Sequence, residues 1–168
     1  MPKKLIAIIG YTAWGKSNTL YTLFDRKRFF PLKSSIWTEN FPSKRFTVIE
    51  ASNEDRSTEE YLNRLKTVLK KHKNSETIFT ITISLIFNRK KHDVMPVFNY
   101  LNSLADFSII YIVLKKSWYK NQSLQPKDIA QMKNKAKANR IKYFDEMINE
   151  SKKNFNKRTE KIAKFIDK

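Results

Sequence analysis

Residues 10–17 read Gly-Tyr-Thr-Ala-Trp-Gly-Lys-Ser, and their types and spacing are suited to binding phosphate groups. Glycines let successive backbone N–H groups of a loop turn toward one anion, and a helix that follows adds the positive end of its dipole. Lys16 would place a point charge on the terminal phosphates, and the Ser17 hydroxyl would ligate Mg²⁺. The residues expected to bind the ligand are Gly10, Tyr11, Thr12, Ala13, Trp14, Gly15, Lys16, Ser17 and Asn18.

The use of glycine supports this interpretation. Glycine averages about 7% of residues in proteins, so roughly a dozen are expected in a chain of this length, yet the 168 residues contain two, and both lie in the motif. The apolar residues 5–9 predict a short buried strand before the loop, and residues 17–24 predict a helix after it. The elements therefore come in the order that a phosphate-binding loop requires.

This strand, loop and helix resemble the Walker A segment of the P-loop NTPase superfamily over residues 5–24. The resemblance implies an α/β fold with three layers, α/β/α, and a mainly parallel sheet, together with an NTP ligand, Mg²⁺ and catalysis by Lys16. The element order is similar to that of Ras-like GTPases. However, residues 50–53 read Glu-Ala-Ser-Asn where GTPases carry Asp-x-x-Gly, and residues 115–118 read Lys-Lys-Ser-Trp where the guanine-binding Asn-Lys-x-Asp would stand. We therefore expect ATP rather than GTP.

A second catalytic and metal-binding residue is expected at Glu50. Residues 45–50 predict a strand, paired as a hairpin with residues 35–38. P-loop enzymes place an acid at the tip of the strand beside the loop strand, where it binds Mg²⁺ directly or through water. Glu50 is the first acid in a suitable place, Glu54 and Asp55 are alternatives, and a solvated acidic loop is the competing interpretation.

The middle of the chain continues the alternation of strands and helices. Residues 57–60 form a capping box before a helix that extends to about residue 73, and residues 77–87 predict a strand. Asp93 is the expected N-cap of the next helix, and residues 107–114 predict the last strand. This pattern predicts a parallel sheet with helices on both faces. Five basic residues follow strand ends and should lie at the same edge as the phosphate-binding loop: Arg89, Lys90, Lys91, Lys115 and Lys116.

The sequence suggests a nucleotide-binding domain at 1–125 and a basic helical extension at 126–168, which shows no strand pattern. Ile141, Ile148, Phe155 and Ile162 recur every seven residues, with Phe144 and Phe165 beside them, and indicate one apolar helix face. Such a face packs on the chain's own core, or else it binds a partner helix or a second copy of the chain.

The amino-acid composition limits which partners, metal sites and cellular locations we expect for this protein. The chain has 34 Lys and Arg against 16 Asp and Glu, a net charge of +18, which is typical of proteins that contact nucleic acid or another polyanion; AT-rich coding gives the same bias without such a partner. Without Cys, thiolate metal sites and disulfides are excluded, and His72 and His92 are expected at the surface. No apolar run is long enough to cross a bilayer and no signal peptide is found, so we expect a cytoplasmic protein without a membrane partner.

The sequence therefore predicts a Mg²⁺-dependent NTP-binding protein, with ATP hydrolysis as its expected activity and coupling to nucleic acid as one possibility. A small-molecule kinase, a GTPase-like switch and a binding module with a degenerate site are the alternatives. The kinase alternative is weakened because lids that close over substrates tend to use glycine hinges, which this chain lacks.

Overall fold

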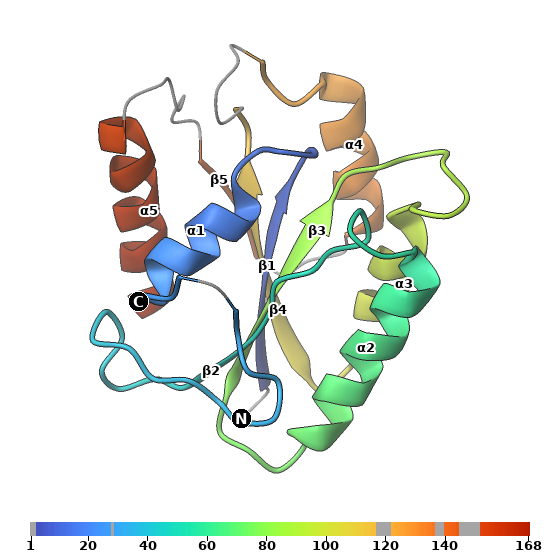
Figure 1. Ribbon diagram of the computed structural model, residues 1–168. Coiled ribbons are helices and arrows are strands. Elements are labelled where there is room, and N and C mark those ends of the chain that lie inside the picture. The colour runs from blue at the N-terminus through green and yellow to red at the C-terminus, as the bar shows by residue number, and fades with distance from the viewer. Residues whose placement is uncertain (1–2, 28, 117–121, 137–139, 145–151) are drawn as a thin grey trace.

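The computed structural model describes residues 3–27, 29–116, 122–136, 140–144 and 152–168, with only the backbone described for 152–155. Strands and helices alternate along these residues (Figure 1). The strands are β1 Lys3–Gly10, β2 Phe46–Ile49, β3 Ile78–Ser84, β4 Phe107–Leu114 and β5 Arg140–Phe144. The helices are α1 Lys16–Leu23, α2 Thr58–Lys71, α3 Met95–Asn102, α4 Pro126–Lys135 and α5 Lys152–Asp167.

The five strands form one sheet in the order β2-β3-β1-β4-β5, and every pairing is parallel. Strand β1 lies in the middle, where Ile8 is in register with Thr82 of β3 and with Ile112 of β4. Helices α1 and α5 cover one face of the sheet, and α2, α3 and α4 cover the other (Figure 1). The predicted α/β class with a parallel sheet is therefore confirmed.

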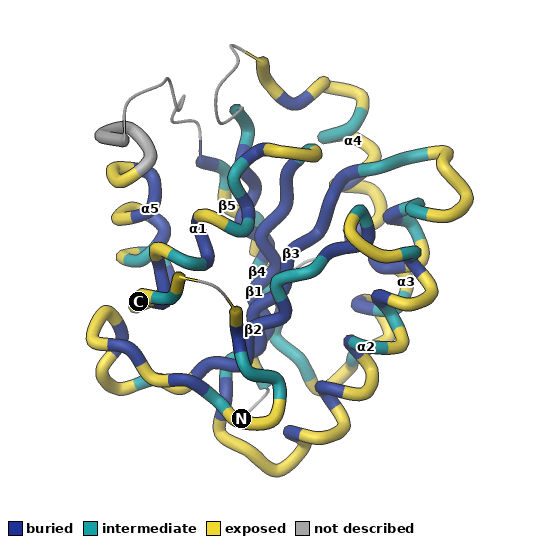
Figure 2. Tube along the Cα trace, viewed as in Figure 1, coloured by how far each residue is buried: buried dark blue, intermediate teal, exposed yellow. Residues whose placement is uncertain are grey.

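Each face of the sheet has its own apolar core, and Figure 2 shows the strands buried between the helices. Because side chains alternate along a strand, Ala7 and Ile9 of β1 pack under α2 and α3, whereas Ile6 and Ile8 pack under α1 and α5. A strand that is buried on both faces reads as a continuous apolar run. This is why the middle strands could be recognised in the sequence.

Both side chains that the sequence predicts as helix caps bond to amides of the first turn, and one of them lies at the N-cap position. The Ser57 side chain accepts a hydrogen bond from the Glu60 amide at 3.2 Å, and α2 begins at the next residue, Thr58. The Asp93 carboxylate accepts one from the Met95 amide at 2.8 Å, but the residue directly before α3 is Val94, so this cap stands one residue earlier than the N-cap position. Both bonds satisfy amides that a helix leaves without a partner in its first turn.

The predicted hairpin at residues 35–50 is wrong. Ile36 and Phe46 form a single antiparallel bridge, with N–O distances of 2.7 and 3.0 Å, and the rest of β2 pairs in parallel with β3. Between them, Phe41 turns into the core beneath α1 and packs against Phe24 and Phe46. Burial of the Phe41 ring, and not strand pairing, holds this mostly exposed loop in place.

The expectation that residues 126–168 lack a strand is also wrong, because β5 pairs with β4 along its whole length. The seven-residue repeat does not lie on one helix: Ile141 belongs to β5, whereas Ile162 belongs to α5. Ile148 and the side chain of Phe155 lie outside the described residues. Ile162 and Ile166 of α5 pack beneath the sheet with α1, so the helix docks on the chain's own core.

Histidine burial departs from the sequence prediction as well. His72 is buried, with Nε2 2.8 Å from the Leu32 carbonyl oxygen. The ring of His92 is half-buried, and its Nδ1 lies 2.8 Å from the Asn53 carbonyl oxygen. Both side chains hold loops together.

Among the described helices, none is both long enough and apolar enough to cross a bilayer.

Candidate functional site

The loop between β1 and α1 contains two residues in the left-handed region of backbone space. Gly15 has a φ of 79° and precedes the first residue of α1, and Ala13 has a φ of 61°. Within the described part of the chain, the backbone amides of residues 15–18 make no hydrogen bond. These amides are therefore free to donate to a ligand, at the end of the helix that carries positive partial charge.

Lys16 is buried beside this loop, with 6% of its surface exposed. Its Nζ donates to the Tyr11 carbonyl oxygen at 2.6 Å and lies 3.4 Å from the Gly10 carbonyl oxygen. Burial lowers the pKa of Lys16 from 10.5 to about 8, and the charges of Glu54 and Asp55 act in the opposite direction. The amine is thus held by carbonyl dipoles and faces carboxylates, although burial favours its neutral form.

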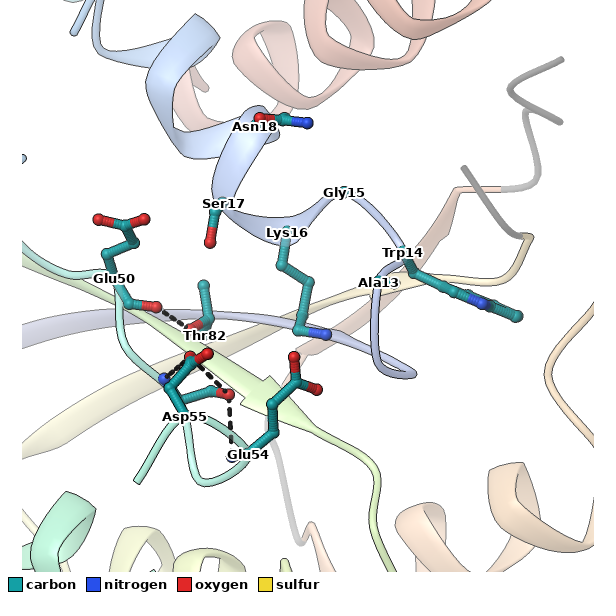
Figure 3. A pocket seen from close by; sticks show the side chains of 11 residues that line it. Ala13, Trp14, Gly15, Lys16, Ser17, Asn18, Glu50, Glu54, Asp55 and Thr82 are labelled. Carbon is teal, nitrogen blue, oxygen red and sulfur yellow. Dashed lines mark hydrogen bonds between the residues drawn. The ribbon is translucent and has the colours of Figure 1, made fainter. Parts of the chain in front are cut away.

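A cavity of about 310 Å³ lies over the loop and the first turn of α1 (Figure 3). One side consists of residues from the β1–α1 loop and the first turn of α1: Ala13, Trp14, Gly15, Lys16, Ser17 and Asn18. The opposite side comes from β3 and from the segment after β2, and consists of Glu50, Ser52, Glu54, Asp55 and Thr82. The cavity therefore joins an amide- and lysine-lined wall to an acidic wall, which is a composition suited to a phosphate and a divalent cation.

Glu50 lines this cavity, but the geometric premise for choosing it is wrong. The strands next to β1 are β3 and β4, so β2, which precedes Glu50, lies one strand farther out. The Glu50 carbonyl oxygen accepts a hydrogen bond from the Thr82 hydroxyl at 2.5 Å. Burial and a hydrogen bond to the Glu50 carboxylate raise the pKa of Tyr21 to about 12. In Figure 3, Glu50 lies on the Ser17 side of the cavity.

The two alternative acids, Glu54 and Asp55, lie in the loop that follows. The Glu54 carboxylate accepts a hydrogen bond from the Ser84 hydroxyl at 2.9 Å, and in Figure 3 it points toward the Lys16 amine. The Asp55 carboxylate accepts one from the Ser52 amide at 2.9 Å. The structure therefore brings all three predicted acids to one cavity, and Glu54 and Asp55 are the two whose charges act on Lys16.

A buried asparagine fixes this acidic loop. The Asn53 side chain accepts from the Ser84 amide at 2.9 Å and donates to the Ser84 carbonyl oxygen at 3.0 Å, so it pairs with β3 as another strand would. It also donates to the His92 carbonyl oxygen at 2.9 Å. Glu54, the next residue, is thereby held at the end of the strand beside β1.

Three of the residues expected to bind the ligand lie away from the cavity lining: Gly10, Tyr11 and Thr12. The Tyr11 hydroxyl instead donates to the Asp128 carboxylate and accepts from the Gln125 amide at 3.1 Å, which ties the loop to the start of α4. Burial and the bond to Asp128 raise the pKa of Tyr11 to about 12. Trp14 is buried against the edge of the Tyr11 ring, and in Figure 3 its ring points away from Lys16.

The expectation that both glycines are sterically required holds only for Gly15. A Cβ added at Gly10 would lie 3.5 Å from the Trp14 Cβ and 3.7 Å from the Leu114 Cβ, which are ordinary van der Waals distances. Gly10 does not have a positive φ, whereas Gly15 does. The first glycine ends β1 in an extended strand, and the second supplies the turn into α1.

Sequence reasoning missed a row of buried hydroxyls on β3 and the segment after β2, of which Thr82 and Ser52 line the cavity. Thr80, Thr82 and Ser84 alternate with isoleucines along β3, and all three are buried. Alternation of this kind places hydroxyls on one strand face and apolar side chains on the other. Ser52 adds a fourth hydroxyl, 3.0 Å from the Ser84 oxygen. The repeated Thr-Ile pattern in the sequence is the signal that indicates this row of hydroxyls, although it predicted only the strand above.

The basic residues after strands β3 and β4 do not line the cavity. Arg89, Lys90 and Lys91 are exposed in the loop before α3. The Lys115 amine lies 5.6 Å from the centre of the Tyr143 ring on β5. Within the described residues, no three His, Cys, Asp or Glu side chains form a metal-binding group.

Comparison with models of protein families, with curated proteins and with solved structures finds no match. The site must therefore be interpreted from its own residues.

Proposed function

We propose that this chain is a P-loop protein that binds a nucleoside triphosphate with Mg²⁺ in the cavity of residues 13–18 and hydrolyses it. The observation that carries the proposal is the arrangement around Lys16: a buried amine, beside a left-handed glycine turn, next to backbone amides that have no acceptor within the described residues. Such amides and a helix N-terminus form a site for phosphate oxygens.

The acidic wall fits a divalent cation. Mg²⁺ prefers oxygen ligands and takes most of them from water and from phosphates, with one or two protein groups completing the set. Ser17 and Glu50 are the proposed ligands, and Glu54 is close enough to Lys16 to order a water or the metal's hydration shell. A bound Mg²⁺ would neutralise charge on the phosphates and polarise them toward attack.

ATP remains the proposed substrate, because the sequence lacks the guanine-selecting carboxylate after β4. The parallel pairing of β2 also departs from the hairpin that a Ras-like element order would give. Hydrolysis requires only that groups position water and stabilise charge. The cavity offers Lys16 and the three nearby carboxylates for both purposes.

The test is binding of ATP and GTP with Mg²⁺ by calorimetry, on wild type, on Lys16→Ala and on Lys70→Ala as a control. Lys70 is an exposed lysine of α2, on the other side of the sheet from α1. Hydrogen bonds to charged groups contribute about 1.5–3 kcal/mol, so Lys16→Ala should weaken binding by roughly 10- to 100-fold. Lys70→Ala should leave the affinity unchanged.

Turnover is followed in the same samples by release of labelled phosphate from ATP. Phosphate release that Lys16→Ala abolishes supports hydrolysis, and label found on an added metabolite would identify a phosphotransferase instead. Equal affinity of wild type and Lys16→Ala, or no binding of either nucleotide, would overturn the proposal.

A further inference from the structure

A second cavity, of about 520 Å³, lies between the edge strand β5 and helix α5. It is lined by Lys142, Tyr143, Phe144, Lys161, Lys164, Phe165 and Lys168. None of these residues lines the cavity over the phosphate-binding loop. We call this cavity the β5–α5 groove, and an inference about it does not depend on the proposed nucleotide site.

The α5 wall of the groove carries a row of positive charges. Lys161 and Lys164 of α5 and Lys168, the residue after α5, line this wall, and Lys157 continues the row one turn earlier. The intervals of four, three and four residues place the helical lysines on one face of α5. Successive lysines are therefore about one helical turn apart, roughly 5.4 Å along the axis. A row of this kind matches a polymer of phosphates better than a single phosphate group.

The β5 wall adds to the same charge. Arg140 and Lys142 alternate with Ile141 and Tyr143 along the strand, so the two basic residues share the strand face of Phe144. The Arg140 guanidinium lies 5.1 Å from the centre of the Phe165 ring on α5. The described carboxylates of α5 are Glu160 and Asp167, and Asp167 is paired with Lys44 at 2.9 Å. The groove is consequently strongly positive.

Between the charged walls the groove has an aromatic floor. Phe144 is buried and Phe165 is half-buried, with ring centres 6.2 Å apart. The floor is fixed because Ile162 and Ile166 anchor α5 in the core next to α1. The half-buried Phe165 ring beside a track of lysines suits a ligand that has both phosphates and flat apolar faces.

We propose that the β5–α5 groove binds single-stranded nucleic acid. The lysines of α5 and Lys142 contact successive phosphates, and the bases lie against the aromatic floor. A duplex presents the same phosphates but keeps its base faces stacked inside, so it cannot use the floor. This occupant also accounts for the lysine-rich composition of α5, where charge is concentrated along one face.

The test measures fluorescence anisotropy of a labelled twelve-nucleotide single strand with the full chain, over salt concentrations from about 50 to 300 mM. The groove variant is Lys142→Ala with Lys164→Ala, which removes one exposed lysine from each wall. The control is Lys70→Ala with Lys127→Ala, which removes the same charge from α2 and α4 on the opposite face of the sheet.

For single strands, each lost phosphate contact lowers the slope of log affinity against log salt by about 0.7. The groove variant should therefore lose about 1.4 in slope and roughly tenfold or more in affinity near 100 mM salt, while the control keeps both values close to wild type. Lys16→Ala should bind the strand as wild type does, which separates this groove from the nucleotide site.

Three results would overturn the proposal. An equal loss in the control variant would mean diffuse attraction to overall charge, and a duplex of the same sequence binding as tightly would remove the role of the floor. Vesicles rich in phosphatidylserine that bind through the groove lysines, with no single-strand binding, would identify a membrane surface as the occupant.

Discussion

The buried guanidinium of Arg158 in α5 donates a hydrogen bond to the Thr19 hydroxyl of α1, with Nη2 and Oγ1 3.3 Å apart. The same hydroxyl donates to the Gly15 carbonyl oxygen at 2.7 Å. Thr19 therefore joins the β1–α1 loop to α5, a helix some 140 residues later in the sequence. The position of the loop depends on a contact that no local pattern around residues 10–17 indicates.

Replacing Thr19 by Val keeps the side-chain shape and removes this bridge. We expect the free energy of unfolding to fall by about 1–3 kcal/mol, because a buried charged group loses an acceptor. Thr22→Val is the matched control: its hydroxyl also bonds to a carbonyl four residues earlier, at 3.0 Å, but it is exposed. Urea unfolding should show a change below about 0.5 kcal/mol for Thr22→Val; similar losses in both variants would contradict the role of Arg158.

The two glycines of the loop should respond differently to alanine. Gly15→Ala must adopt a φ of 79°, and we expect it to lose about 1–2 kcal/mol of stability. Gly10→Ala places its new Cβ no closer than 3.5 Å to a neighbour, so we expect a change within about 0.5 kcal/mol. Thermal and urea unfolding of the pair give the comparison directly. Equal destabilisation would contradict the ordinary van der Waals distances around Gly10.

Nucleotide affinity should depend on pH through Lys16. Its pKa is lowered to about 8 in the unliganded protein, and the protonated amine is the form that attracts phosphate. Below pH 8 the amine is charged and affinity stays constant, while above pH 8 a proton must be taken up on binding, and affinity falls by up to about tenfold per unit. Calorimetry between about pH 6.5 and 9.5 measures this.

Lys16→Arg provides the control for that titration, since a guanidinium stays protonated throughout the range. Its affinity for ATP, whatever its absolute value, should be independent of pH over the same interval. A slope in Lys16→Arg that equals the slope in wild type would assign the pH dependence to another group.

Asn53 should matter more for stability than any exposed polar residue of the chain. Asn53→Ala leaves the Ser84 amide and two carbonyl oxygens without the partners described above. Each buried group without a partner costs about 1–3 kcal/mol, so we expect a loss of roughly 3 kcal/mol or more. Asn63→Ala, at an exposed position of α2, should change stability by less than about 0.5 kcal/mol in the same urea titration.

The elements that sequence reasoning predicted correctly are those whose burial leaves a strong local pattern. Strands β1 and β4 are buried on both faces and read as apolar runs, and the caps at Ser57 and Asp93 use short-range side-chain bonds. Strand β5 escaped prediction because it lies at the sheet edge, where Arg140 and Lys142 stand among the apolar residues. Its character is set by pairing with β4 and not by its own composition.

The candidate site likewise contains some residues that a local pattern identifies and others that only the sheet topology brings together. Residues 13–18 were found from their spacing, because they are consecutive and span one loop and the first turn of α1. The opposite side of the cavity comes from segments more than 30 residues away, and the order of strands decides which acids meet Lys16. That order placed β3, and not β2, beside β1, so Glu54 and Asp55 act on the lysine while Glu50 lies nearer Ser17. Strand order was beyond the reach of a local pattern.

Both borders of the sheet discourage a further strand from joining it. On one border, β2 is four residues long and Ile36 occupies a bonding position beside Phe46. On the other, Arg140 and Lys142 would bring like charges together if two molecules met border to border. An open sheet edge would otherwise be a template for strand pairing between molecules. These features of β2 and β5 oppose edge-to-edge aggregation of two copies of the chain.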